Sequence, residues 1–183
     1  VELPSQIMEN WAAAPEVLKV YARHWKTGEP MPQELIDKLQ ASSLFNQGFI
    51  VVEFMSAALL DMAYHSVKDT TPIDAEKFEK ETLEQLGLIP EITVRYRSPY
   101  FGHIFNGGYS AGYYTYTWAE VLDADAFEAF KETGDLFNPE KARLFRENVL
   151  SKGGSDEPMK LYKQFRGQEP STEPLLRRKG LIK

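Results

Sequence analysis

The sequence contains no cysteine, so neither a disulfide framework nor a thiolate metal site can contribute to its fold or chemistry. Charge of one sign is not in large excess either. The 21 basic and 27 acidic residues are interspersed and give a net charge of −6. This balance argues against nucleic acid or an anionic membrane as the main partner. The apolar stretch at 49–55 is interrupted by Glu53, so we expect no membrane-spanning segment.

The chain also lacks an initiating methionine, and its first residues show neither the basic start nor the apolar core of a signal peptide. We therefore expect it to begin inside a longer protein, cut by design or by proteolysis. The predicted location is the cytoplasm, although the absence of cysteine is equally compatible with a periplasm. With 183 residues, 43% of them hydrophobic, the chain suits one globular domain or a large piece of one.

Apolar residues recur at helical spacing through most of the chain, which predicts an all-α fold forming one unit over residues 1–183. Residues 5–25 should form two successive helices, because Pro15 is tolerated in a first helical turn. The longest candidate helix is 44–67. Its predicted core-facing stripe consists of Phe45, Phe49, Val52, Met55, Leu59 and Met62. A further long helix is expected over 109–130.

Several helix boundaries can also be predicted from the sequence. Asp74 should cap a helix that ends at Gly87, and Asn138 should begin another. Ser155 is expected to cap a last short helix that ends at Gly167. Residues 89–99 contain two prolines and alternate in polarity, so this segment is predicted to be extended or irregular.

The three histidines, His24, His65 and His103, include no His-Glu-x-x-His arrangement. A zinc peptidase of that type needs two imidazoles one helical turn apart with a glutamate between them as general base. This chain therefore cannot build such a site alone. Asp61 and His65 are four residues apart and could form a hydrogen bond on one helix face, most simply as a structural pair.

Six of the nine tyrosines lie in the segment 96–118, around a histidine and a glycine turn. If a helix begins near Tyr109, then Tyr109, Tyr113 and Tyr116 share one face. Buried hydroxyl groups need hydrogen-bond partners, so this face suggests a polar pocket. Gly107 and Gly108 would let the backbone move or approach a ligand closely. The alternative is an aromatic helix that packs against a neighbouring domain.

Two long motifs point to a known family. Val-Glu-Leu-Pro-Ser-Gln-Ile-Met-Glu-Asn-Trp, at 1–11, resembles the segment that follows the His-Glu-Phe-Gly-His helix in zinc peptidases of the thimet oligopeptidase family. Phe-Gly-His-Ile-Phe-Asn-Gly-Gly-Tyr-Ser-Ala-Gly-Tyr-Tyr-Thr-Tyr-Thr-Trp, at 101–118, resembles the glycine–tyrosine substrate-binding segment of that family. Shorter segments at 44–49, 59–62 and 161–167 also resemble the family, and all the matching segments occur in the same order as in the family. The sequence and spacing between His103 and Tyr109 are most similar to those of bacterial peptidyl-dipeptidases, also called dipeptidyl carboxypeptidases.

This resemblance implies that the chain is the C-terminal portion of a zincin-like, mostly helical metallopeptidase catalytic domain. It makes Glu2 one ligand of a catalytic zinc ion, Zn2+, and Glu9 a candidate supporting group beneath it. The other two ligands and the general base would come from the upstream part of the same domain, which carries the His-Glu-x-x-His helix. The isolated chain should then be inactive.

The resemblance also assigns roles in the glycine–tyrosine segment. Tyr116, and with it Tyr109, would donate hydrogen bonds to the oxyanion of the tetrahedral intermediate. His103 would contact substrate or the oxyanion at the same wall, and Tyr113 is a further candidate for substrate binding. The Gly107–Gly108 turn would let the tyrosines close on the substrate.

The implied activity is hydrolysis of short peptides with release of C-terminal dipeptides. One alternative is an oligoendopeptidase of the same family, which would not require a free substrate C-terminus. Another is a non-catalytic helical module whose tyrosine face binds peptides or proteins. Arg95 and Arg97 could anchor a substrate carboxylate, but surface ion pairs explain both residues equally well.

Overall fold

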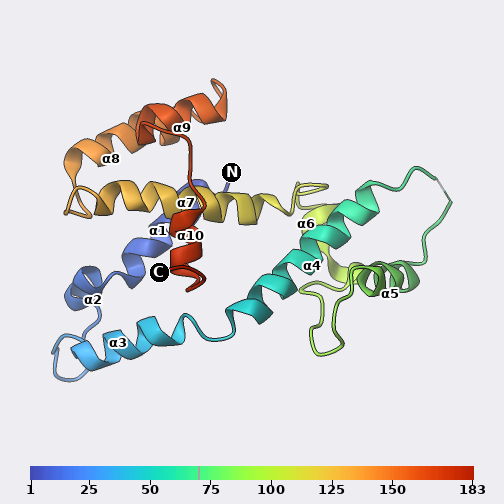
Figure 1. Cartoon of the computed structure of the whole chain (residues 1–183), viewed down its shortest axis with the longest axis horizontal. Coiled ribbons are helices and arrows are strands. Elements are labelled where there is room, and N and C mark those ends of the chain that lie inside the picture. The colour runs from blue at the N-terminus through green and yellow to red at the C-terminus, as the bar shows by residue number, and fades with distance from the viewer. Residues whose placement is uncertain (70) are drawn as a thin grey trace. The chain divides into compact units, whose positions relative to one another are not determined.

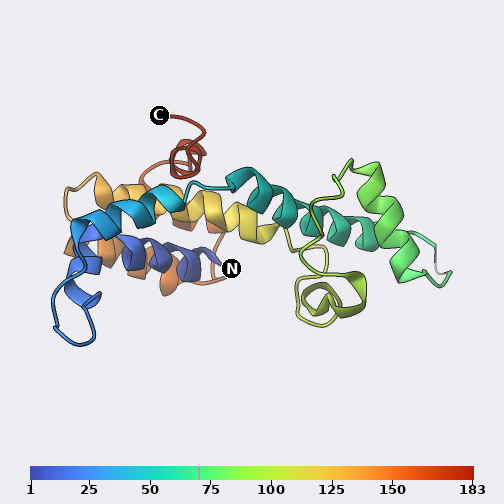
Figure 2. The same cartoon turned by 90° about the horizontal axis from the view of Figure 1, so that it is seen from below.

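The computed structural model describes residues 1–69 and 71–183, which divide into two compact units. The first unit comprises Val1–Leu44 and Thr117–Lys183, and the second comprises Phe45–Tyr116. Figures 1 and 2 show the helices of both, and each unit is described by itself. Across the described residues the only β-type pairing is an isolated bridge between Arg23 and Pro30, so the all-α prediction is confirmed. Membership of all 183 residues in one catalytic domain remains a prediction.

The helices of the first unit begin and end largely where local signals predict. They are α1 (Leu3–Ala13), α2 (Pro15–Tyr21), α3 (Gln33–Ser42), α7 (Thr115–Lys131, which begins in the second unit), α8 (Pro139–Phe145), the π-helical turn η2 (Arg146–Leu150), α9 (Pro158–Arg166) and α10 (Glu173–Arg178). Pro15 opens α2, and the Asn138 side chain accepts the backbone N–H of Lys141 at 3.0 Å. Gly167 ends α9 with a φ of +88°. The Ser155 prediction was wrong, because α9 begins at Pro158 after an uncapped Glu157.

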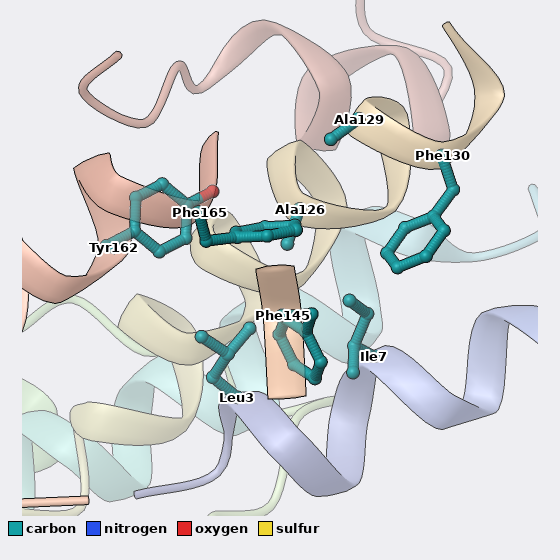
Figure 3. Close-up of a cluster of buried hydrophobic side chains, with 8 residues drawn as sticks. All are labelled: Leu3, Ile7, Ala126, Ala129, Phe130, Phe145, Tyr162 and Phe165. Carbon is teal, nitrogen blue, oxygen red and sulfur yellow. The ribbon is translucent and has the colours of Figure 1, made fainter. Parts of the chain in front are cut away.

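The core of the first unit fixes α1, the helix that directly follows Glu2. Figure 3 shows side chains from four helices pointing toward one another, with Leu3 and Ile7 of α1 among them. The buried cluster is Leu3, Ile7, Ala126, Ala129, Phe130, Phe145, Tyr162 and Phe165. Trp11 packs edge-on against Phe127 and Phe130 at centroid distances of 4.8 and 4.9 Å. Burial of this surface holds the start of α1 in place.

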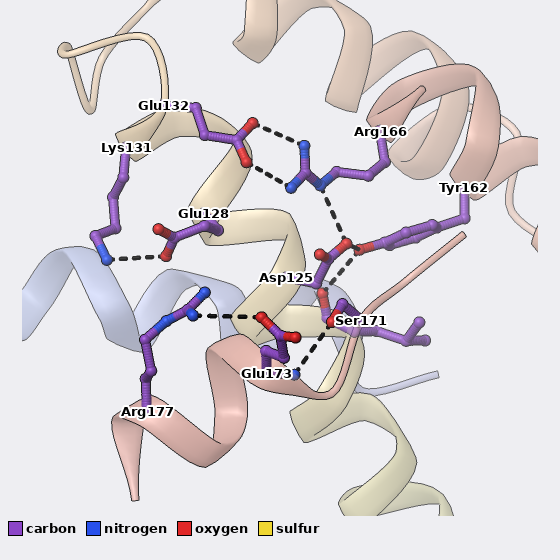
Figure 4. Close-up of polar contacts among 10 residues, drawn as sticks. Asp125, Glu128, Lys131, Glu132, Tyr162, Arg166, Ser171, Glu173 and Arg177 are labelled. Atoms are coloured by element: carbon purple, nitrogen blue, oxygen red, sulfur yellow. Dashed lines mark hydrogen bonds and ion pairs between the residues drawn. The ribbon is translucent and has the colours of Figure 1, made fainter. Parts of the chain in front are cut away.

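Asp125, a buried carboxylate of α7 in the first unit, has charged and hydroxyl partners. Arg166 binds both oxygens of Glu132, at 2.8 and 2.7 Å, and its Nε donates to Asp125 at 3.1 Å (Figure 4). The Tyr162 hydroxyl also donates to Asp125, at 2.6 Å. The pKa of Tyr162 is raised above its usual range, mainly because the side chain is buried and secondly because of this hydrogen bond to Asp125. These bonds tie α9 to α7 and pair the buried charge of Asp125 with a guanidinium through its Oδ2 atom.

In the second unit, α4 (Gln47–His65) and α5 (Ala75–Gln85) pack together, followed by the short helices η1 (Ser98–Tyr100) and α6 (Gly102–Phe105). Asp74 caps α5 as predicted, by accepting the backbone N–H of Lys77 at 3.0 Å. The segment before η1 is non-helical, as its alternating pattern predicts, and it contributes Val94 to the core. The buried cluster is Ala57, Ala58, Leu60, Val94, Phe101, Ile104 and Tyr113.

The predicted core-facing stripe of α4 was wrong for this unit. Phe45 is 74% exposed, and four further stripe residues are between 41% and 44% exposed: Phe49, Val52, Leu59 and Met62. The buried side chains of α4 are Ser56, Ala57, Ala58, Leu60 and Asp61. Small side chains on that face let the chain between Ile92 and Tyr113 approach closely, and the elements of the unit leave the apolar stripe uncovered.

By length and composition alone, α4 is the one helix among the described residues that could cross a membrane. The expectation that no segment is long and apolar enough is therefore corrected. The signal is weak, because a core helix of a soluble protein passes the same test. The helix also contains Glu53 and a fully buried Asp61 that is committed to hydrogen bonds within its unit.

Candidate functional site

A histidine and three tyrosines of the segment 96–118 lie together in the second unit. The rings of Tyr109 and Tyr116 are stacked with their centroids 5.0 Å apart, and Tyr113 lies 5.2 Å from Tyr116. The His103 ring is 5.7 Å from Tyr113, 6.2 Å from Tyr109 and 6.5 Å from Tyr116. We call His103, Tyr109, Tyr113 and Tyr116 the tyrosine cluster. Its members are the side chains to which the family resemblance assigns oxyanion stabilisation or substrate contact.

The backbone that brings these rings together is not the predicted helix. The helix α7 begins at Thr115, so Tyr109 and Tyr113 precede it and do not share a helical face with Tyr116. The chain cannot be helical here, because Gly108 has a φ of +84° and Ala111 a φ of +53°. An irregular turn therefore places Tyr109 against Tyr116, where the sequence predicts one helix face.

Asp61 of α4 fixes the position of this turn. Its side chain is completely buried, and its two oxygens accept the backbone N–H groups of Ala111, at 3.0 Å, and Tyr113, at 2.9 Å. The Nδ1 atom of His65 lies 2.8 Å from Asp61 Oδ1, which confirms the predicted pair. The backbone bonds were missed, because a partner 50 residues away leaves no local signal in the sequence. Asp61 thus positions the tyrosine cluster through hydrogen bonds to the backbone.

Both glycines of the turn are required by geometry. A Cβ atom on Gly107 would lie 2.8 Å from the Cα of His103 and 2.9 Å from its carbonyl oxygen, which is closer than real contacts. Gly108 needs no extra space but adopts the left-handed region that favours glycine. The Tyr109 N–H then donates to the His103 carbonyl at 3.0 Å, which closes the turn. Mobility of this turn remains a prediction.

Two further aromatic residues, which the sequence did not assign to the site, line the tyrosine cluster. The ring of Tyr96 is 4.9 Å from that of His103, and Phe54 of α4 stacks on Tyr113 at 5.1 Å. Tyr113 is buried, and burial raises its pKa to about 12, with nearby Arg95 acting in the opposite direction. The shift reinforces the protonated form that a tyrosine hydroxyl ordinarily has at neutral pH.

The predicted metal ligand, Glu2, belongs to the first unit and immediately precedes α1. Its Oε2 accepts a hydrogen bond from the Ser5 hydroxyl at 2.7 Å, so the carboxylate is oriented by its own helix. Glu9 lies on α1 and is exposed. Within residues 1–69 and 71–183, no group of three histidine, cysteine, aspartate or glutamate side chains could hold a metal ion. The described residues therefore do not form a zinc site by themselves.

Comparison with known proteins gives matches along the whole chain. The model of Peptidase family M3 matches residues 1–181. The dipeptidyl carboxypeptidase of Escherichia coli is 45% identical over 99% of this chain, and the oligopeptidase A of Salmonella typhimurium is 41% identical over the same share. Saccharolysin of Saccharomyces cerevisiae is 33% identical over 99%. The chain covers 27% of the length of both bacterial proteins and 25% of saccharolysin, so it spans about a quarter of these relatives.

Proposed function

The chain belongs to peptidase family M3, and on this basis we propose that it is the part of a zinc-dependent peptidase that binds short peptides and stabilises the reaction at their scissile bond. The observation that carries the proposal is the gathering of His103 with Tyr109 and Tyr116, whose rings lie within 6.5 Å of His103. A family match over residues 1–181 supports the reaction class, and the cluster supports the roles of individual residues.

Hydrolysis of a peptide bond passes through a tetrahedral intermediate with a negatively charged oxygen. Donors that are already oriented toward the position of this oxygen lower the barrier, typically by about 3–4 kcal/mol for each donor. In our proposal Tyr116 and Tyr109 donate these hydrogen bonds. His103 and Tyr113 contact the substrate at the same wall, and the Tyr113 hydroxyl is protonated at neutral pH, as a tyrosine hydroxyl ordinarily is. Asp61 holds the segment against α4 by accepting the backbone N–H groups of Ala111 and Tyr113.

The zinc ion implied by the family needs ligands that the described residues do not supply. Glu2 would contribute one carboxylate oxygen, a ligand type that zinc accepts beside imidazoles. Because the described part of the chain has no group of three possible ligands, the remaining ligands and the general base would come from the rest of the peptidase. This is the upstream part of the catalytic domain that the family resemblance implies.

The uncovered stripe of α4 supports the same partner. An apolar stripe along a 19-residue helix is normally buried in a folded protein. The relatives have roughly three quarters of their length outside the part that matches this chain. We therefore assign the stripe to the interface with the remaining part of the peptidase. In the complete protein its side chains would then be buried, as their helical spacing predicts.

The names of the relatives support peptide hydrolysis but include both modes of cleavage. One is a dipeptidyl carboxypeptidase and others are oligopeptidases. We propose release of C-terminal dipeptides, because the sequence of the glycine–tyrosine segment resembles that of bacterial peptidyl-dipeptidases. Cytoplasmic location also remains a prediction, because the Arabidopsis thaliana relatives are named both cytosolic and organellar.

The test is cleavage of one quenched peptide by the complete peptidase with zinc, with the peptide carrying a free or an amidated C-terminus. We expect a C-terminal dipeptide to be released from the free form, with the amidated form cut far more slowly. Product masses identify the bond that is cut. Equal cleavage of both forms would indicate an oligoendopeptidase. Failure to cut either, with zinc bound, would refute the peptidase proposal and favour the binding module.

A second prediction concerns the chain of residues 1–183 alone. We expect calorimetry to show zinc binding weaker than micromolar and no cleavage of either peptide, because a catalytic zinc site needs three protein ligands. The matched control is Glu2→Gln, which should change this weak signal little. Stoichiometric binding at micromolar affinity or tighter would show that the chain holds a complete site and would overturn the prediction.

A further inference from the structure

Arg95 lies beside the tyrosine cluster. Its guanidinium carbon is 5.7 Å from the ring centroid of Phe54 and 5.8 Å from that of Tyr96. Both rings contact Tyr113, at 5.1 and 6.2 Å. Burial acts to lower the pKa of Arg95, but the neighbouring Tyr113 and Tyr96 hydroxyls more than offset it and the net shift is upward. A permanent positive charge therefore adjoins the wall that we propose for substrate contact.

Arg97, two residues further on, has a different environment. Its Nε donates to Oε1 of Glu79, a carboxylate that is only 3% exposed. The other oxygen of Glu79 accepts the backbone N–H of Ser98 at 2.6 Å. This arrangement ties α5 to η1, so Arg97 has a structural partner that explains it fully. The sequence offers both arginines equally as carboxylate anchors, but the structure gives them different environments.

Arg95 has no comparably close carboxylate partner among its described contacts. Its Nη1 lies 3.6 Å from Oε2 of Glu53, and both side chains are partly exposed, at 44% and 28%. Charge-assisted hydrogen bonds between arginine and carboxylate are shorter, about 2.7–2.9 Å, and are often bidentate. A loose pair of this kind at a partly exposed position contributes little to stability. It leaves the guanidinium able to hold a second carboxylate.

We propose that Arg95 binds the C-terminal carboxylate of the peptide substrate and thereby makes the peptidase select for a free C-terminus. The inference rests on the proposed function, since it takes the tyrosine cluster as the wall that contacts the substrate. The planar guanidinium matches the two oxygens of a carboxylate, and its carbon lies within 5.8 Å of the ring centroids of Phe54 and Tyr96, which restrict its position. Arg95 is a specificity-determining residue here and takes no part in the bond-breaking step.

The test measures kcat/KM of the complete peptidase on a peptide with a free C-terminus and on its amidated counterpart. Wild type should prefer the free peptide. Arg95→Gln should lower the ratio of the two kcat/KM values by about 10- to 100-fold, as expected for loss of a hydrogen-bonded charge partner. Arg95→Lys should restore part of the ratio, because it keeps the charge without the bidentate geometry.

Arg97→Gln is the matched control. This variant disturbs the Glu79 site and lowers the amount of folded enzyme, which scales both rates equally and leaves their ratio unchanged. A ratio unaffected by Arg95→Gln, or lowered equally by Arg97→Gln, would overturn the inference while the peptidase function stands. Failure of the wild type to cut either peptide would instead refute the proposed function on which the inference rests.

Discussion

Replacement of Tyr116 by phenylalanine is expected to lower kcat of the complete peptidase by at least ~100-fold while KM changes little. The variant removes one hydroxyl group and keeps the ring, so its stacking on Tyr109 at 5.0 Å should persist. A donor that acts on the oxyanion stabilises the transition state more than the bound substrate, and its loss therefore appears in kcat. Steady-state kinetics on the free peptide provide the measurement.

Tyr114→Phe is the control for this prediction. Tyr114 lies in the same segment, is 50% exposed and belongs to no ring contact of the tyrosine cluster among the described residues. Removal of its hydroxyl should leave kcat within about twofold, as is usual for a surface change. If Tyr116→Phe also leaves kcat unchanged, Tyr116 has no part in the mechanism. A rise in KM alone would make it a residue for substrate binding only.

Replacement of Asp61 by alanine is expected to destabilise the second unit by about 3 kcal/mol, since two buried backbone N–H groups then lose their acceptor and each costs about 1–3 kcal/mol. The amides of Ala111 and Tyr113 should lose protection against hydrogen exchange before the rest of the unit, because Asp61 is their acceptor. Hydrogen exchange followed by NMR on the chain measures both effects.

Glu84→Ala provides the comparison for Asp61. Glu84 is on the surface of α5, and its oxygen lies 3.8 Å from Lys80 Nζ, so its removal should change stability by less than about 0.5 kcal/mol. Asp61→Asn keeps one oxygen acceptor and should retain part of the protection. Unchanged exchange at residues 111 and 113 in Asp61→Ala would show that the turn is held by other contacts.

Predictions from the sequence succeed here where the cause is local. Asp74 and Asn138 cap helices through an N–H three residues away, and Gly167 ends α9 at a positive φ. A window of a few residues contains all the information that such features require. The tyrosines and glycine pair of 96–118 also drew attention to this segment, but only the family resemblance assigned roles to its residues.

The errors arise where the cause lies far along the chain. The start of α7 was placed too early, because the acceptor for the amides of Ala111 and Tyr113 is Asp61, at separations of 50 and 52 residues. Helical spacing in α4 identified an apolar stripe correctly but could not show what covers it. Likewise, the buried Glu79 that pairs with Arg97 could not be foreseen, because its position beside Arg97 depends on how α5 packs.

The turn at 107–111 has a consequence for how this site can change during evolution. Gly107 excludes any side chain, and Gly108 and Ala111 exclude β-branched residues through their positive φ values. Few residue types are therefore tolerated at these three positions. Positions beside the phenol rings carry no such constraint on the main chain, so substitutions there can change substrate contacts while the turn stays fixed. Libraries designed to alter peptide preference should accordingly vary the residues around the rings and leave the turn intact.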